Sequence, residues 1–203
     1  ICAEGAAEER PETVVAMLQS RLTRLESAAR RLVLAASIFG ESFSRAGVSA
    51  VLEMPEDLQW LTAGLEALQA AELTQHSALG ALPSDGNFSF RHALVKDAAY
   101  ELLSATDRAT GHRLAAEFLV RSQAAEATVV ASHFERGGEL ARAAQHYWLS
   151  AERCFQQCDY RGALRQVENG LRCSTDRELL ARLASVECAI AYRTGRFSEG
   201  HAA

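Results

Sequence analysis

The sequence has almost no lysine and little proline. Lys96 is the only lysine among 203 residues, and there are three prolines. A phosphate-binding P-loop requires a lysine directly after a glycine-rich loop, whereas Lys96 follows Val95 with no glycine nearby. We therefore expect no nucleotide-binding P-loop within this chain. The scarcity of proline, with abundant alanine, leucine and arginine, favours helix almost throughout.

Motifs of common catalytic and metal sites are also missing. The chain has no H-E-x-x-H, no G-x-S-x-G and no C-x-x-C, so we expect no catalytic residue, no metal and no cofactor within it. The six histidines are scattered, and His112 and His133 fall in otherwise apolar helical segments. We therefore expect His112 and His133 to have a structural role, with their ring nitrogens hydrogen-bonded inside the protein. The sequence therefore does not resemble an enzyme.

Five cysteines without short regular spacing argue against a disulfide framework. Cys154 and Cys158 lie one helical turn apart and could share a metal. The better interpretation places Cys154, Cys158, Cys173 and Cys188 on apolar faces of packed helices, because buried free cysteine behaves as a small hydrophobe.

Neither half of the chain has the excess of positive charge that binding to a nucleic-acid backbone requires. Residues 1–105 carry 8 basic and 14 acidic side chains, and residues 106–203 carry 13 and 12. No apolar run approaches the roughly 20 residues that span a bilayer, and charged residues from Glu4 to Arg10 do not fit a signal peptide. We therefore expect a cytoplasmic protein that binds neither DNA nor membrane. The first residue is Ile1, so we also expect a piece of a longer protein.

The first half reads as helices followed by a hairpin. Apolar residues at intervals of three and four predict helices from Pro11 to about Leu25, from Glu26 to Gly40, over 46–52, and from Asp57 to about Ala71. Residues 73–77 could be extended, 78–87 are a loop by composition, and 88–91 alternate apolar and polar residues as strands do. A further helix is expected over 92–104. Three helices followed by a β-hairpin predict a winged-helix-like domain over residues 1–105.

A winged helix invites a DNA-binding interpretation, which the charges oppose. The candidate recognition helix, residues 57–71, carries Asp57 and Glu66 but no arginine or lysine. Contacts to bases and phosphates depend mainly on arginine and lysine. This domain is therefore expected to act as a packing and switch module.

The second half reads as helical hairpins in series. A helix over residues 107–122 is followed by four helices whose connecting turns share a pattern: a turn residue, a polar residue, a large apolar residue and, three further on, a small residue. The pattern begins at Gly138, Cys158 and Gly195, and the last two are 37 residues apart, close to the 34-residue tetratricopeptide period. About residues 125–203 therefore resemble degenerate tetratricopeptide repeats. We predict a tetratricopeptide-like helical repeat domain over residues 106–203 and a mostly α fold class.

Aromatic side chains in this array are candidates for contact with a partner. We take Tyr147, Trp148 and Tyr192 as the partner-binding residues, because aromatic side chains dominate binding surfaces. Packing within and between the repeats is the alternative for the aromatic residues of this half, and is the commoner role of such side chains.

Two segments carry a resemblance that covers nearly the whole chain. They are residues 88–100 (FSFRHALVKDAAY) and residues 29–40 (ARRLVLAASIFG). Both resemble the region after the ATPase core in signal-transducing ATPases of the STAND class, AAA-type regulators that accompany cyclase, kinase or LuxR-type domains. The resemblance implies that His92, preceded by Arg91, senses the β-phosphate of ADP held by an ATPase domain outside this chain. Ala93 departs from relatives that have aspartate there, and the alternative is that His92 merely caps its helix.

The resemblance implies a non-catalytic regulatory or sensor fragment of an ATP-dependent signalling or transcriptional regulator. ATP or ADP would bind elsewhere in the longer protein, and the partner would be another protein or the intramolecular ATPase domain. A free-standing scaffold that binds a peptide or protein through the helical array is the alternative.

Overall fold

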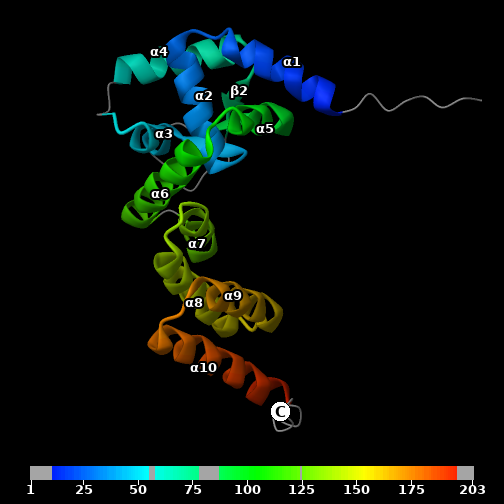
Figure 1. Cartoon of the computed structure of the whole chain (residues 1–203), viewed down its shortest axis with the longest axis vertical. Coiled ribbons are helices and arrows are strands. Elements are labelled where there is room, and N and C mark those ends of the chain that lie inside the picture. The colour runs from blue at the N-terminus through cyan, green and yellow to red at the C-terminus, as the bar shows by residue number, and fades with distance from the viewer. Residues whose placement is uncertain (1–10, 55–57, 78–86, 124, 196–203) are drawn as a thin grey trace, which may run out of the picture. The chain divides into compact units, whose positions relative to one another are not determined.

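The computed structural model describes residues 11–54, 58–77, 87–123 and 125–195 (Figure 1). The described chain is mostly helical and contains a small antiparallel sheet. Its contacts divide it into two compact units, residues 1–115 (unit 1) and 116–203 (unit 2). The boundary predicted between residues 105 and 106 falls at the start of helix α6 (Ala105–Ser122), and the two units divide within this helix.

Unit 1 begins with two helices and continues through short strands and helices. In chain order, its elements before α6 are α1 (Pro11–Thr23), α2 (Ser27–Phe39), β1 (Ser42–Ser44), α3 (Arg45–Val51), α4 (Leu58–Ala70), β2 (Thr74–His76), β3 (Asn87–Phe90) and α5 (Ala93–Glu101). The predicted helices and the two predicted strands are confirmed to within a few residues. Most of the predicted loop over 78–87 lies outside the described residues.

The sheet has three strands, with β3 between β1 and β2. β2 and β3 pair antiparallel, as expected for a hairpin, with His76 opposite Phe88. β1 was not predicted and pairs with the other edge of β3, with Phe43 opposite Phe88. The phenylalanine side chains of β1 and β3 face the core, and the ring centroids of Phe43 and Phe88 are 5.9 Å apart.

Helix α2 is central to the core of unit 1 because it contacts both α4 and α5. Its apolar spacing continues nearly all round the helix, so Leu32, Val33 and Ala36 are fully buried. Gly64 of α4 lies so close to α2 that a Cβ built there would be 2.1 Å from a methyl carbon of Leu32. The helices can therefore approach this closely only with a very small residue at position 64.

Unit 2 consists of helices stacked in chain order after the end of α6. They are α7 (Ala127–Arg136), α8 (Leu140–Gln156), α9 (Tyr160–Cys173) and α10 (Arg177–Thr194), which confirms the four helices predicted there. Helix α8 packs against α7 and α9, and α10 contacts both α8 and α9. The core includes small residues at Ala143, Ala144 and Ala163, which let neighbouring helices approach closely.

The turn residues identified from the sequence have the left-handed backbone conformation. The φ angles are +80° at Gly138, +61° at Cys158 and +71° at Gly195. After Cys158, the Asp159 side chain caps α9 by accepting a 2.9 Å hydrogen bond from the backbone N–H of Gly162. The repeated pattern therefore corresponds to a repeated local geometry.

Replacing Cys158 with glycine is expected to raise the free energy of unfolding of unit 2 by about 1 kcal/mol. A side chain at positive φ costs roughly 1–2 kcal/mol, and glycine avoids that cost at the expense of some chain entropy. Urea denaturation followed by circular dichroism measures the change. Gly138→Ala is the matched control and should lower the stability by a similar amount. Equal stability of Cys158→Gly and the natural protein would contradict the prediction.

Candidate functional site

The junction between β3 and α5 presents His92 to solvent. Residues 91–94 are all exposed. His92 occupies the N-cap position of α5 with extended backbone angles (φ −138°, ψ 135°), but its side chain makes no capping hydrogen bond. Its backbone carbonyl instead accepts from the N–H of Val95 at 3.0 Å. The imidazole is therefore not used to cap the helix, which argues against the simple capping role considered from the sequence.

Arg91 is fixed through its backbone and paired through its side chain. Its N–H donates to the carbonyl of Leu73 at 3.1 Å, which extends the pairing of β2 and β3 by one residue. Its guanidinium is 3.6 Å from a carboxylate oxygen of Glu72, and both side chains are largely exposed. Such an exposed ion pair contributes little to stability, so the guanidinium can exchange this partner for another anion at low cost.

Besides the exposed guanidinium of Arg91, the first turn of α5 also favours binding of an anion. The N-terminus of a helix carries partial positive charge and backbone N–H groups without intrahelical acceptors. Because His92 and Arg91 directly precede this turn, the junction combines a possible imidazole donor, a guanidinium and a helix N-terminus within a few residues. A phosphate is the chemistry that this combination suits best.

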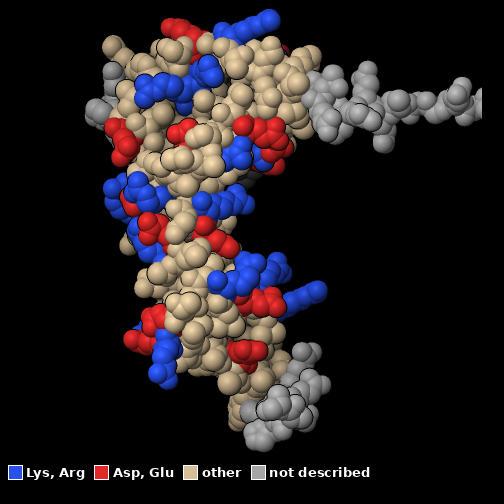
Figure 2. All heavy atoms as spheres, in the orientation of Figure 1, with Lys and Arg blue, Asp and Glu red and all other residues tan. Residues whose placement is uncertain are grey.

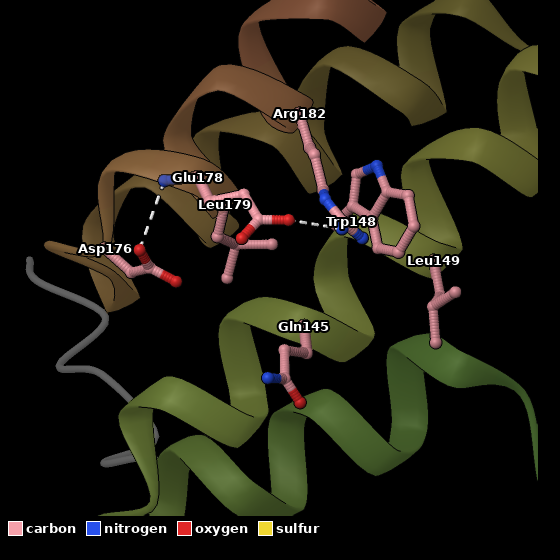
Figure 3. A pocket seen from close by; sticks show the side chains of 7 residues that line it. All are labelled: Gln145, Trp148, Leu149, Asp176, Glu178, Leu179 and Arg182. Carbon is pink, nitrogen blue, oxygen red and sulfur yellow. Dashed lines mark hydrogen bonds and ion pairs between the residues drawn. The ribbon is translucent and has the colours of Figure 1, made fainter.

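A second candidate site lies between α8 and α10, where Trp148 and Arg182 stack (Figure 3). The guanidinium carbon of Arg182 is 5.0 Å from the centroid of the indole ring, within the range of a cation–π interaction. A carboxylate oxygen of Glu178 is 2.6 Å from the same guanidinium. The hollow has a volume of about 320 Å³ and is lined by Gln145, Trp148, Leu149, Asp176, Glu178, Leu179 and Arg182.

This hollow has a mixed chemical character. Leu149 is 44% exposed and contributes apolar surface to the hollow. Across from it, one carboxylate oxygen of Asp176 accepts a hydrogen bond from the backbone N–H of Glu178 at the start of α10 (Figure 3). Helix α8 thus contributes an aromatic, an apolar and an amide side chain, whereas α10 and its N-cap contribute three charged side chains and Leu179. A peptide side chain with an apolar stem and a polar end would fit this arrangement.

Tyr147 lies in the core of unit 2 rather than on a binding surface. It is 4% exposed, and its hydroxyl donates a hydrogen bond to a carboxylate oxygen of Glu135. Arg172 donates to the other oxygen of Glu135 at 3.1 Å. Burial, together with the carboxylate of Glu135, raises the pKa of Tyr147 well above its usual range. This network joins α7, α8 and α9. Tyr147 therefore packs within the helical array rather than presenting its ring to a partner.

The three aromatic candidates do not form one surface. Trp148 is half-buried in the hollow between α8 and α10, whereas Tyr192 is 70% exposed near the end of α10. Reasoning from the sequence missed Arg182, Glu178 and Leu149. The spacing of Glu178 and Arg182 by four residues is a readable signal for an ion pair on a helix, but nothing in the sequence indicates that the pair stacks on Trp148.

The two histidines expected to be structural are buried. His112 is 1% exposed, with its Nε2 atom 2.9 Å from the hydroxyl of Tyr100. His133 is 7% exposed, and burial, with a smaller effect of the Arg136 charge, lowers its pKa to about 4. His133 is therefore neutral at physiological pH.

The expected burial of four cysteines is only partly correct. Cys173 is buried and Cys154 is half-buried, but Cys158 and Cys188 are exposed. Cys158 is exposed because it occupies the turn between α8 and α9 rather than a helix face. No three histidine, cysteine or carboxylate side chains gather as a possible metal site among the residues that the structure describes.

The candidate recognition helix of unit 1 carries no basic side chain. Helix α4, the candidate recognition helix, has Glu66 as its single charged residue. On the face shown in Figure 2, basic and acidic side chains are interspersed over the surface. None of the described helices is both long and apolar enough to cross a bilayer.

Comparison with protein-family models, with curated proteins and with solved structures finds no match to this chain.

Proposed function

We propose that the chain is a non-catalytic regulatory part of an ATP-dependent signalling or transcriptional regulator in the cytoplasm. Unit 1 is a winged-helix module, and unit 2 is a tetratricopeptide-like array that contacts another protein or another part of the same polypeptide. The observation that carries the proposal is the exposed His92, whose imidazole does not cap the helix that it precedes.

The topology of unit 1 supports the winged-helix part of the proposal. From α2 onward the order is helix, strand, helix, helix, strand, strand, which is three helices with a hairpin after the third. β1 adds to the free edge of β3, so the hairpin is anchored to the helical part of the module. His92 follows two residues after the end of β3, so the paired strand fixes the backbone that leads to His92.

The arrangement of unit 2 supports the array. Helices α8 and α9 with their turn span residues 140–173, the length of one tetratricopeptide repeat. Helices α7, α8 and α9 pack mainly on their neighbours in the chain, and α10 packs on both α8 and α9, as expected where hairpins cannot bury an apolar face alone.

The proposed mechanism is a shift between two packings. In the resting state, His92 and the first turn of α5 contact the β-phosphate of ADP held by an ATPase domain. Binding of a partner to the array then favours a second arrangement in which this contact is lost. A ligand can drive such a change only by its difference in affinity for the two states.

The test is the affinity for ADP of the complete natural polypeptide that contains these residues. His92→Ala should weaken ADP binding roughly tenfold or more, because hydrogen bonds to charged groups contribute about 1.5–3 kcal/mol. His76→Ala, which removes another exposed histidine of unit 1, is the matched control and should leave the affinity unchanged. Equal ADP affinity for the natural protein and His92→Ala would refute the nucleotide-sensing role.

The hollow at Trp148 favours a second candidate function, a free-standing scaffold for a peptide or protein. In that case Trp148→Ala should abolish capture of the partner from a peptide panel, whereas His92→Ala should have no effect. The two variants therefore separate the regulatory function from the scaffold function.

A further inference from the structure

The charges in the hollow between α8 and α10 do not balance. Glu178 and Arg182 form an ion pair with a nitrogen–oxygen distance of 2.6 Å, and the guanidinium of Arg182 also stacks on Trp148. Asp176 lines the same hollow, and its carboxylate forms no ion pair with any residue that the structure describes. One negative charge in the hollow is therefore left without a cationic partner in the described chain.

The Asp176 carboxylate is held in place but is not saturated with hydrogen bonds. It occupies the N-cap position of α10, where its Oδ1 atom accepts from the backbone N–H of Glu178 at 3.1 Å. Its Oδ2 atom accepts from no described residue. A carboxylate has about four acceptor positions, so Asp176 can accept further hydrogen bonds. Because the cap already orders the side chain, a ligand would not have to bear that entropic cost.

The surface opposite Asp176 is neutral. Figure 3 shows Gln145, Trp148 and Leu149 along α8, across the hollow from the residues at the start of α10. The side chain of Gln145 is exposed and makes no hydrogen bond to a described residue. Lysine and arginine bury their methylene stems against apolar surface while their charged ends stay hydrated or paired. The hollow offers apolar surface for such a stem and a carboxylate for such an end.

We propose that the hollow binds a lysine or arginine side chain of a partner peptide, and that Asp176 selects its positive charge. The stem lies against Leu149 and Trp148, and the cationic end donates to the free oxygen of Asp176 and to the side-chain oxygen of Gln145. An acidic side chain would meet the carboxylate of Asp176 and a guanidinium that Glu178 already pairs, so it is rejected. This inference rests on the scaffold function proposed above and adds the class of side chain that is recognised.

The test compares three short peptides of alternating serine and alanine that differ only in a central lysine, glutamine or glutamate. Binding to the complete chain is followed by the NMR signal of the Trp148 indole N–H in a Trp60→Phe background, where Trp148 is the only tryptophan. The lysine peptide should bind about three- to fivefold more tightly than the glutamine peptide, as expected for an exposed ion pair. The glutamate peptide should bind most weakly, and added salt should reduce the differences.

Asp176→Asn separates charge from folding, because asparagine caps a helix about as well as aspartate but carries no charge. This variant should bind the lysine and glutamine peptides with equal affinity. Asp159→Asn is the matched control, since Asp159 caps α9 by accepting from the N–H of Gly162 and does not line the hollow. The control should retain the full preference for lysine.

Three results would overturn the inference. The first is equal binding of the three peptides, or tightest binding of the glutamate peptide. The second is a preference for lysine that Asp176→Asn retains, because the cation would then bind elsewhere. The third is an unshifted Trp148 signal with every peptide at millimolar concentration. The scaffold function is judged separately, by capture from the peptide panel with and without Trp148→Ala, so the two failures are distinguishable.

Discussion

Replacing Phe88 with alanine is expected to lower the free energy of unfolding of unit 1 by about 3–5 kcal/mol. Phe88 is 1% exposed in the central strand β3. Its ring lies between those of its two cross-strand partners, with centroids 5.9 Å from Phe43 and 4.8 Å from His76. Truncation would leave a cavity that neither edge strand can fill alone, because strands of three residues have few other contacts.

The two tryptophans allow this loss to be assigned to one unit. Trp60 lies in α4 of unit 1 and Trp148 in α8 of unit 2. Urea unfolding of Phe88→Ala, followed by Trp60 fluorescence in a Trp148→Phe background, should show the lower stability. Met17→Ala removes a side chain that is 64% exposed and should cost much less. A loss at Phe88 no larger than that at Met17 would show that the sheet does not anchor unit 1.

Apolar periodicity explains why most helices could be predicted. Leu32, Val33 and Ala36 of α2 repeat at helical spacing, and all three are buried. The end of α2 is equally clear, since Gly40 follows the last apolar residue and has φ +100°. In such segments the local pattern and the tertiary packing demand the same structure, so the sequence alone is sufficient.

Strand β1 could not be predicted in this way. It has three residues, Ser42–Ser44, and alternation over so short a stretch is indistinguishable from chance. Its existence depends on pairing with β3, which follows more than forty residues later in the chain. Ser44 also caps α3 by accepting from the N–H of Gly47 at 3.0 Å, and that capping signal masks the strand.

The features of the candidate sites also differ in how far a local sequence pattern predicts them. The strand and helix patterns predict a junction at His92, whereas its proposed sensing role comes from the resemblance of residues 88–100 to signal-transducing ATPases. The network of Glu135, Tyr147 and Arg172 could not be predicted, since its members come from three helices and each is an ordinary helix residue in isolation. Polar contacts between helices depend on rotation about the helix axes, which the packing of the whole unit determines.

Acidification from pH 7 to pH 5 is expected to destabilise unit 2 by about 2 kcal/mol through His133. Burial and, to a lesser extent, Arg136 lower the pKa of this imidazole from 6.5 to about 4 in the folded state. The unfolded chain therefore binds the proton more readily, so stability is lost as the pH falls below 6.5 and the loss levels off near pH 4. Burial and Arg142 also lower the pKa of His146, which adds in the same direction.

The measurement is urea unfolding at pH 7 and pH 5, followed by Trp148 fluorescence in a Trp60→Phe background. His133→Gln replaces the imidazole with a neutral side chain that does not titrate. This variant should lose most of the pH dependence, whatever its stability at pH 7. His146→Gln is the matched control and should retain the larger part, because His146 is less deeply buried. If the pH dependence were the same with and without the imidazole of His133, folding would not lower the pKa of this group, and the prediction would be wrong.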